Sequence, residues 1–403
     1  MLKRVVVTGI GVINSIAKNT SELKTALLQG HSGLKKNDRF NTAEYRNEYG
    51  FLISGMSEML STQPEIKKYK ITSQYGIIAA KEALHLSKLS SCKMDAQRIG
   101  VCMGTTLVGV TDWIKYFEQE KKDISLFLSN QSNLSGDIAE YFNFKGNVST
   151  ISTACAASTN SIGYAYQLIK NGKSDYMIAG GSDPFTCFSL SGFNTMKVVA
   201  TDTCRPFDSN RTGMMLGEGG AVVLLETVES AIQREAKIYA EIAGFATGND
   251  AYHPTAQDPS GEGIFEMLQR CFKNSIINPD AIDYINAHGT GTKGNDSTEL
   301  KALYKTFGEH LYKIPISSTK SQIGHTLGAA GANELVCCIV AMENNFLPPT
   351  INTRNTINID HNVCQKLDFV LNKGRFVEKL KTILSTSYAF GGNTAAIIIK
   401  RYE

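Results

Sequence analysis

The sequence predicts an α/β fold built from one unit that occurs twice. Strand-like runs rich in β-branched residues alternate with segments of helical period, as in proteins whose helices pack on a sheet. The first half opens on LKRVVVTGIG, and a similar run, AKIYAEIAGF, opens the second half. No Pro/Ser-rich linker separates the halves. We therefore expect residues 1–232 and 233–403 to pack as one body, joined near residues 229–236.

Three further pairs of segments support the repeat. RIGVCMGTT, at 98–106, and AIDYINAHGTGT, at 281–292, are each a short strand that leads into a Gly/Thr loop. NVSTISTACAAS and KIPISSTKSQIGH each end a strand and begin a helix, and GAVVLLE has a partner in TAAIIIK. Because the pairs occur in the same order in both halves, we expect a duplicated α/β unit with one interface between the copies.

The composition is that of an ordinary soluble globular protein. Of the 403 residues, 42% are hydrophobic and 20% charged, and the net charge of +3 gives no bulk argument for binding nucleic acid or a membrane. The nine cysteines include no C-x-x-C pair, which predicts free thiols in a reducing compartment. No apolar run approaches the roughly 18 residues of a membrane span, and the apolar N-terminal run lacks a signal-peptide cleavage site. We therefore expect a cytoplasmic enzyme.

The first strand carries a weak motif. Gly9 and Gly11 have the spacing of a dinucleotide-binding loop, but the third glycine of that motif is missing. No group of residues with metal-ligand spacing occurs elsewhere. The sequence therefore predicts neither a dinucleotide site nor a metal site.

The strand predicted at 148–153 stops beside a cysteine. Cys155 is followed by small residues and then by a helical pattern that stops at Asn171 and Gly172. A thiol at a helix N-terminus lies near the positive end of the dipole, which should lower its pKa, and backbone N–H groups there can hold an oxyanion. These features predict a nucleophile. A small buried hydrophobic residue is the alternative interpretation.

A histidine ends a predicted strand in the second half. His288 lies in NAHGTGTKGND, where Thr290 and Thr292 can offer hydroxyls to a polar substrate arm. A single histidine in such a place is more often a structural residue than a functional one. The longest irregular stretch, residues 250–263, is predicted to be a surface loop near the site.

A lysine and a second histidine precede a helix that begins with small residues. Lys320 and His325 lie in SSTKSQIGH, ahead of LGAAGANE. Close packing explains the small residues, but it does not explain the lysine and the histidine. Glu334, on the helix, can neutralise Lys320 if that lysine is buried.

Near the C-terminus, Phe390 precedes two glycines in SYAFGGNTA. Glycines allow a positive φ, which can aim a backbone donor at a ligand. A plain glycine turn is the alternative interpretation.

Taken together, STACAAS, NAHGTGTKGND, TKSQIGHTLGAAGANE and FGGN resemble the β-ketoacyl-[acyl-carrier-protein] synthases, the elongating condensing enzymes of fatty acid and type II polyketide synthesis. The motifs occur in that family's order, and the resemblance runs along nearly the whole chain. It implies a thiolase fold, in which a duplicated α/β unit forms five layers (αβαβα). It also implies a dimer, of identical chains or with a related subunit.

The resemblance implies a role for each motif. Cys155 would take the growing acyl chain as a thioester. His288 and His325, with Lys320 in the same centre, would bind the malonyl thioester carbonyl and promote decarboxylation. The resulting enolate would extend the chain by two carbons. This acyltransferase reaction needs no cofactor beyond the phosphopantetheine that arrives on the acyl carrier protein.

Further positions match the family's supporting and binding residues. Among the supporting residues, Glu334 would pair with Lys320, Asp296 would be an acid near the second-half loop, and Phe390 would be a gate whose N–H forms the oxyanion hole with that of Cys155. Thr290 and Thr292 would contact phosphopantetheine, and Leu107 and Phe193 would line the acyl pocket. The acidic carrier would dock on Lys67, Lys68 and Lys197.

The chain also departs from the family pattern. Ala389 stands where glycine is usual, and we expect it to stiffen the gate loop because alanine disfavours positive φ. Gly291 and Lys293 replace the usual serine and proline, and FGGNT inverts the usual ending. These departures favour a dedicated type II polyketide or polyene pathway as the alternative. Two other functions are less compatible with the sequence. A thiolase would carry a second catalytic cysteine in a C-terminal C-x-G motif, where this chain has YAFGGN. A non-catalytic chain-length subunit would lack the nucleophile, whereas Cys155 is present.

Overall fold

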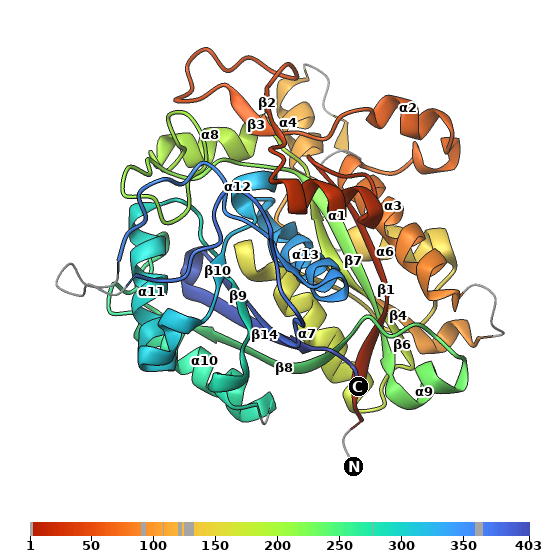
Figure 1. Cartoon of the computed structure of the whole chain (residues 1–403). Coiled ribbons are helices and arrows are strands. Elements are labelled where there is room, and N and C mark those ends of the chain that lie inside the picture. Colours follow the sequence, from red (N-terminus) through yellow and green to blue (C-terminus); the bar gives the residue numbers. More distant parts are fainter. Residues whose placement is uncertain are drawn as a thin grey trace.

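The computed structural model of the chain describes residues 3–89, 94–107, 109–119, 123–124, 133–275, 277–358 and 366–403. Within these residues ten strands form one continuous sheet, in the order β10-β9-β13-β14-β8-β1-β7-β6-β4-β5 (Figure 1). The strands are β1 (Val5–Asn14), β4 (Ile99–Gly104), β5 (Val148–Ile151), β6 (Tyr176–Asp183), β7 (Gly219–Thr227), β8 (Ala240–Asn249), β9 (Tyr284–Asn286), β10 (Ile316–Ser317), β13 (Thr382–Tyr388) and β14 (Asn393–Lys400).

The sheet has the same strand arrangement on either side of its middle. The first half contributes β1-β7-β6-β4-β5 and the second half β8-β14-β13-β9-β10, so the four similar segment pairs of the sequence occupy equivalent places. The halves meet where β1 pairs antiparallel with β8, with Val6 opposite Glu241. The predicted duplication is therefore confirmed. The predicted join falls on α9 (Val228–Gln233), between β7 and β8.

Helices form three layers around the two halves of the sheet (Figure 1). α3 (Ile71–Ser87) and α6 (Asn133–Phe142) cover the outer face of the first half, and α10 (Glu262–Ser275) and α11 (Lys293–Phe307) cover the second. α7 (Ala157–Lys170) and α13 (Ala330–Asn344) lie together in the middle and contact strands of both halves. The predicted five-layer αβαβα arrangement of a thiolase fold is confirmed.

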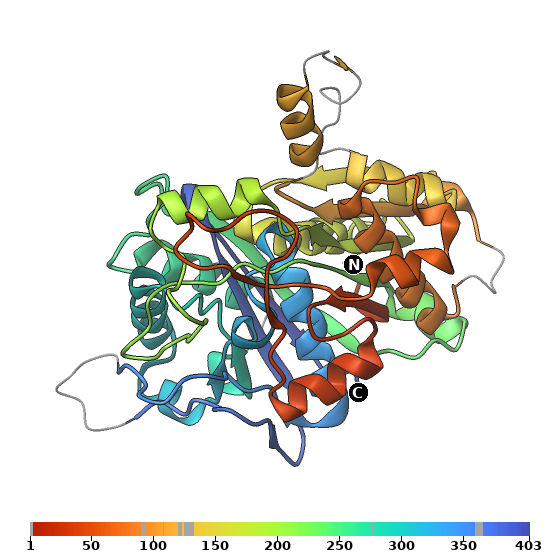
Figure 2. The same cartoon turned by 90° about the horizontal axis from the view of Figure 1, so that it is seen from above.

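The remaining elements lie around these layers. Seen from above, α4 (Val110–Glu118) projects away from the body (Figure 2). The other helices are α1 (Thr20–Gln29), α2 (Met56–Ser61), α4 (Val110–Glu118), α8 (Cys187–Thr195) and α12 (Lys320–Ile323); the 3₁₀ turns are η1 (Pro64–Ile66), η3 (Ala96–Arg98), η4 (Ala154–Ala156), η5 (Pro279–Ala281), η6 (Gly308–Lys313), η7 (Leu327–Ala329) and η8 (Phe390–Gly392). Two small sheets pair β2 (Leu34–Lys36) with β3 (Tyr49–Phe51) and β11 (Phe346–Leu347) with β12 (Arg375–Phe376).

The two central helices approach each other closely because their contact residues are small. A Cβ on Gly331 of α13 would lie 1.8 Å from Oγ1 of Thr159 on α7, so no larger residue fits there. α13 is buried from Ala330 to Met342, as expected of a helix that is apolar on nearly every side. This packing brings the start of α7, from the first half, against the start of α13, from the second.

Two general expectations can be compared with the structure. The seven cysteines in the described part of the chain are free thiols, as predicted, while Cys92 and Cys364 lie outside it. No described helix combines the length and the apolar character that crossing a bilayer requires.

Candidate active site

Cys155 lies on the short turn η4, between the end of β5 and the start of α7. β5 ends at Ile151, two residues before the predicted strand end, and α7 stops at Asn171 and Gly172 as predicted. Ala154 has a φ of +49°, a left-handed conformation that a residue with a Cβ seldom adopts. This strained turn presents the thiol at the edge of the central layer.

A cavity of about 400 Å³ brings the predicted site residues of both halves together. Cys155 enters it from the first half, and the two histidines enter it from the second. Residues of the loop predicted at 250–263 also line it, so that loop does cover the site. The lining residues that the argument below uses are Cys155, Phe193, Val198, His288, Thr290, Thr292, His325, Tyr388, Ala389 and Phe390.

The rings of His288 and His325 lie 5.5 Å apart, almost perpendicular to each other. Nδ1 of His288 faces Nζ of Lys320 at 3.1 Å, and Nδ1 of His325 accepts the backbone N–H of Leu327 at 3.0 Å. Because an ammonium and an amide can only donate, both Nδ1 atoms act as acceptors. Each neutral ring therefore carries its proton on Nε2.

Burial keeps both imidazoles neutral. It lowers the pKa of His288 and of His325 well below the ordinary value, and the positive charge of Lys320 lowers both further. Each is therefore a neutral Nε2–H donor at physiological pH.

Lys320 is a buried cation whose three donors are all used. Nζ donates to Nδ1 and, at 2.6 Å, to the backbone oxygen of His288, and it forms an ion pair with Glu334. Both side chains are 1% exposed. The sequence-based prediction that Glu334 neutralises Lys320 is confirmed. Burial raises the pKa of Glu334 to about 7, although Lys320 opposes the rise.

The predicted lowering of the Cys155 pKa is wrong for this structure. Burial raises the pKa of the thiol to about 11, which outweighs the charge of Lys320 and the backbone N–H groups of Phe390 and Cys155. Desolvation of the thiolate in this buried position is the largest effect on the thiol. The two N–H groups that the sequence assigned to an oxyanion hole do lie beside the sulfur.

The gate loop differs from expectation at Ala389. Its φ is −138°, an extended conformation open to any residue, so alanine causes no strain there and the expected stiffening is wrong. The positive φ values fall on Gly391 and Gly392, both at +74°. Gly391 also donates its N–H to the oxygen of Pro254 at 2.7 Å, which ties the gate to the loop over the site.

A second, largely apolar cavity of about 260 Å³ adjoins Cys155. Leu107, Phe193 and Phe390 line it together with Cys155, and the rings of Phe193 and Phe390 lie 5.7 Å apart. The two residues predicted to border an acyl pocket therefore do lie beside the thiol.

Besides Lys320 and Glu334, four predicted residues do not line either cavity. Asp296 is buried and accepts the N–H groups of Phe207 and Gly291 at 2.8 and 3.1 Å, so it holds the loop that carries Thr290 and Thr292. The others are exposed lysines, of which Lys68 pairs with Glu140 and Lys197 adjoins the cavity-lining Val198. They are Asp296, Lys67, Lys68 and Lys197.

Sequence reasoning missed three buried residues of the site. Glu299 accepts the N–H groups of His288 and Gly289, each at 2.8 Å, and burial raises its pKa to about 7. Asp183 accepts the N–H groups of Thr106 and Gly328 and so ties the two halves together. Tyr388 lies against His288, with ring centroids 5.6 Å apart. The available signals were positional: Asp183 ends a Gly-Gly strand, and Glu299 follows His288 in the same motif region.

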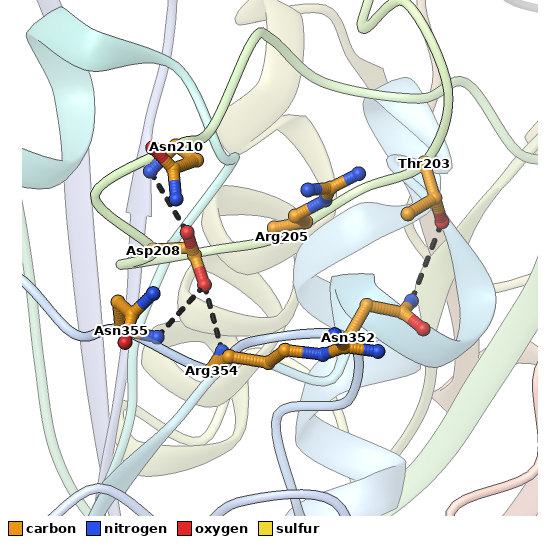
Figure 3. Close-up of a pocket in the computed structure, with 7 residues that line it drawn as sticks. All are labelled: Thr203, Arg205, Asp208, Asn210, Asn352, Arg354 and Asn355. Carbon is orange, nitrogen blue, oxygen red and sulfur yellow. Dashed lines mark hydrogen bonds between the residues drawn. The ribbon is translucent and has the colours of Figure 1, made fainter.

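A hollow of about 430 Å³, lined by polar and charged residues, shares no lining residue with these two cavities. Figure 3 shows the residues that line it. Asp208 accepts the backbone N–H groups of Asn210, Arg354 and Asn355 and so joins two loops. Arg205, on its wall, pairs with Asp202. None of the predicted site residues lines this hollow, and its hydrogen bonds serve the loop structure.

Two family models match the chain. The Beta-ketoacyl synthase N-terminal domain matches residues 2–231, and the Beta-ketoacyl synthase C-terminal domain matches residues 239–354. The chain belongs to the β-ketoacyl synthase family. The resemblance drawn from the four motifs is therefore confirmed for this β-ketoacyl synthase.

Similar proteins cover the whole chain. It is 36% identical to 3-oxoacyl-[acyl-carrier-protein] synthase 2 of Coxiella burnetii, over 99% of both chains, and 33% identical to the protein of that name from Synechocystis, over 100% of this chain and 99% of that one. Among solved structures, the ishigamide ketosynthase/chain length factor is similar with a TM-score of 0.92 at 31% identity, covering both chains fully. A type II polyketide ketosynthase, AntDE, in complex with its acyl-carrier protein AntF, has a TM-score of 0.90 at 29% identity, again over both chains.

Proposed function

We propose that this β-ketoacyl synthase condenses malonyl-acyl carrier protein with an acyl chain held on Cys155, with loss of CO₂. The observation that carries the proposal is the meeting of one thiol and two neutral histidine donors in a single cavity. The thiol comes from the first half of the chain and the donors from the second. Such an arrangement suits a reaction that needs both an acyl acceptor and a stabilised carbanion.

The first half-reaction loads the acyl chain. The sulfur of Cys155 attacks the thioester carbonyl of the acyl carrier, the bond to the carrier sulfur breaks, and the carrier thiol leaves with the proton. The N–H groups of Phe390 and Cys155 stabilise the oxyanion of the tetrahedral intermediate. The chain then occupies the apolar cavity between Leu107 and Phe193.

The second half-reaction forms the carbon–carbon bond. Malonyl loses CO₂, and its electron pair remains on the α-carbon and the thioester oxygen as an enolate. The Nε2–H groups of His288 and His325 donate to that oxygen as it gains charge. The enolate carbon attacks the acyl-Cys155 carbonyl, the C–S bond breaks, and the thiolate of Cys155 leaves and takes up a proton. The product is a β-ketoacyl carrier two carbons longer.

The carrier supplies the substrates and the only cofactor in this scheme. Its phosphopantetheine arm passes Thr290 and Thr292, which line the cavity. Its acidic surface docks on the basic residues Lys67, Lys68 and Lys197. The reaction takes place in the cytoplasm, where such carriers are used.

The pathway we favour is fatty acid synthesis, since the relatives from Coxiella and Synechocystis are named 3-oxoacyl-[acyl-carrier-protein] synthase 2. A type II polyketide or polyene pathway is the second candidate, supported by the similarity to the ishigamide and AntDE ketosynthases. In either case we propose a dimer. The edge strand β5 carries Val148, which is 44% exposed and can pair with a second copy or a related subunit.

Mass spectrometry tests the proposal. Incubation with acyl carrier protein should add the acyl mass to the peptide that contains Cys155, and malonyl carrier should then yield CO₂ and a product longer by two carbons. Cys155→Ala should abolish both loading and elongation. Acylation of another cysteine alone would contradict the assignment. A second catalytic cysteine would indicate a thiolase, and no acylation would indicate a non-catalytic chain-length subunit.

A further inference from the structure

Tyr388 places a buried hydroxyl without a hydrogen-bond partner beside the histidine pair. It is the last residue of β13, it lines the cavity that holds Cys155, and it is 1% exposed. Its ring lies 5.6 Å from the ring of His288 at 70°. Among the described residues no group makes a hydrogen bond to its Oη. A buried hydroxyl in this state destabilises the protein unless something else binds to it.

The neighbours of the phenol leave it free to donate. Burial raises the pKa of Tyr388 well above its ordinary value, and the charge of Glu299 adds to the rise. The phenol is therefore protonated. Thr386 Oγ1 already accepts the N–H of His288 at 3.1 Å and donates to Glu299 at 2.9 Å, and it makes no hydrogen bond to the phenol.

The group that accepts the hydrogen bond of Tyr388 can be inferred by counting donors and lone pairs in the complex with malonyl carrier protein. This inference therefore rests on the proposed function. A thioester oxygen has two lone pairs, and the two histidine Nε2–H groups occupy them. Lys320 cannot reach further, because His288 and Glu334 use its three donors. The free carboxylate of the malonyl group is then the acceptor that remains for a donor beside His288. We infer that Tyr388 Oη donates a hydrogen bond to that carboxylate and so positions and selects the extender unit.

This role has a kinetic signature that differs from that of the histidines. The carboxylate loses its negative charge as CO₂ departs, so the hydrogen bond is strongest in the bound substrate and weakens toward the transition state. Removing it should raise KM for malonyl without lowering kcat. The loss of a hydrogen bond to a charged group corresponds to roughly a 10- to 100-fold change in affinity.

The test compares Tyr388→Phe with the wild type in both half-reactions. KM for malonyl carrier protein in CO₂ release should rise about 10- to 100-fold, with kcat unchanged or higher. Acylation of Cys155 should proceed at the wild-type rate. The Tm should stay equal or rise, since no protein hydrogen bond is lost. Tyr284→Phe is the matched control: its hydroxyl bonds Ser317 Oγ at 2.6 Å, so this variant should lose Tm and keep the malonyl KM.

Each outcome decides the inference. A Tyr388→Phe variant that loses kcat at constant KM would show that the phenol acts on the enolate, and the inference would be wrong. Unchanged kinetics in an enzyme that condenses normally would also overturn it and leave the proposed function intact. A wild-type protein that neither acylates Cys155 nor releases CO₂ would overturn both.

Discussion

Lys320 and His288 form a single donor–acceptor unit, with Nζ of the lysine 3.1 Å from Nδ1 of the imidazole. The contact fixes the ring proton on Nε2, and the lysine charge helps to keep the ring neutral. Glu334 balances that charge in the interior. We therefore expect the lysine to act on the reaction through the histidine, and this can be tested.

Replacing Lys320 with methionine should slow CO₂ release about 10- to 100-fold, because the tautomer of His288 is no longer fixed. Loss of the positive charge should also raise the pKa of His288, so the acid limb of the rate profile should move to higher pH. Glu334 would be left as an unpaired buried carboxyl. Lys320→Met with Glu334→Gln should restore stability relative to the single variant and keep the altered pH profile. An unchanged profile in both would assign the lysine a purely structural role.

The histidines should act in decarboxylation and not in loading. His288→Ala and His325→Ala should each reduce CO₂ release from malonyl carrier by about 10²- to 10³-fold, the typical effect of losing one oxyanion donor. Acyl-Cys155 should still form, since the Phe390 and Cys155 N–H groups stabilise that step. The two half-reactions are measured separately with labelled substrates. Wild-type CO₂ release by either variant would remove that histidine from the mechanism.

The thiol of Cys155 should react more slowly at neutral pH than a free cysteine. Burial raises its pKa to about 11, so deprotonation, and with it reactivity, increases as pH rises toward that value. Alkylation of the Cys155 peptide should accelerate about tenfold per pH unit between pH 7 and 10, because only the thiolate reacts. The measurement is iodoacetamide labelling followed by peptide mass spectrometry, with Cys155→Ser as background. A plateau below pH 9 would contradict the buried thiol.

Charge reversal at Lys67 and Lys68 should raise KM for carrier-bound substrates and leave KM for pantetheine thioesters unchanged. Added salt should have the same effect on the wild type, because it screens attraction between exposed charges. The matched control is Lys379→Glu with Lys381→Glu, which changes the net charge by the same amount. These two lysines precede the first residue of β13, whereas Tyr388, which lines the cavity, is its last residue. Equal effects of the two double variants would exclude a specific docking role for Lys67 and Lys68.

Leu107→Phe should shorten the acyl chains that the enzyme accepts. Leu107 lines the apolar cavity beside Cys155, so a larger ring there removes volume at its wall. Acetyl transfer should persist while longer chains are rejected, as measured by the mass added to Cys155 across a series of acyl carriers. Equal loss for every chain length would indicate misfolding, which the Tm would reveal.

The sequence predicted which residues form this site better than it predicted their pKa values and backbone conformation. The order of the motifs predicted that Cys155, His288, His325 and Lys320 belong to one site. The similar segments, which occur in the same order in both halves, predicted the duplicated unit. The pKa of Cys155 and the φ of Ala389 were mispredicted, because burial and backbone conformation depend on packing between segments far apart in the chain.

The roles of Glu299 and Tyr388 could not be predicted from sequence alone. Glu299 resembles any helix glutamate until its contact with the backbone of His288 is seen. Tyr388 resembles a core aromatic residue, and only its lack of a hydrogen-bond partner distinguishes it. Both roles depend on which groups surround the side chain in the folded protein, and a sequence pattern does not record that.

The doubled sheet has a consequence for how unlike chemistry can arise at one centre. An assembly of two identical chains with twofold symmetry must place the same side chain at both related positions. Here the turn after β5 carries Cys155, whereas the equivalent turn after β10 carries Lys320 and His325. Covalent fusion of the two copies removes the symmetry requirement. One copy is then free to specialise in accepting an electrophile and the other in generating a carbanion, a division of labour that two separate, identical units cannot adopt.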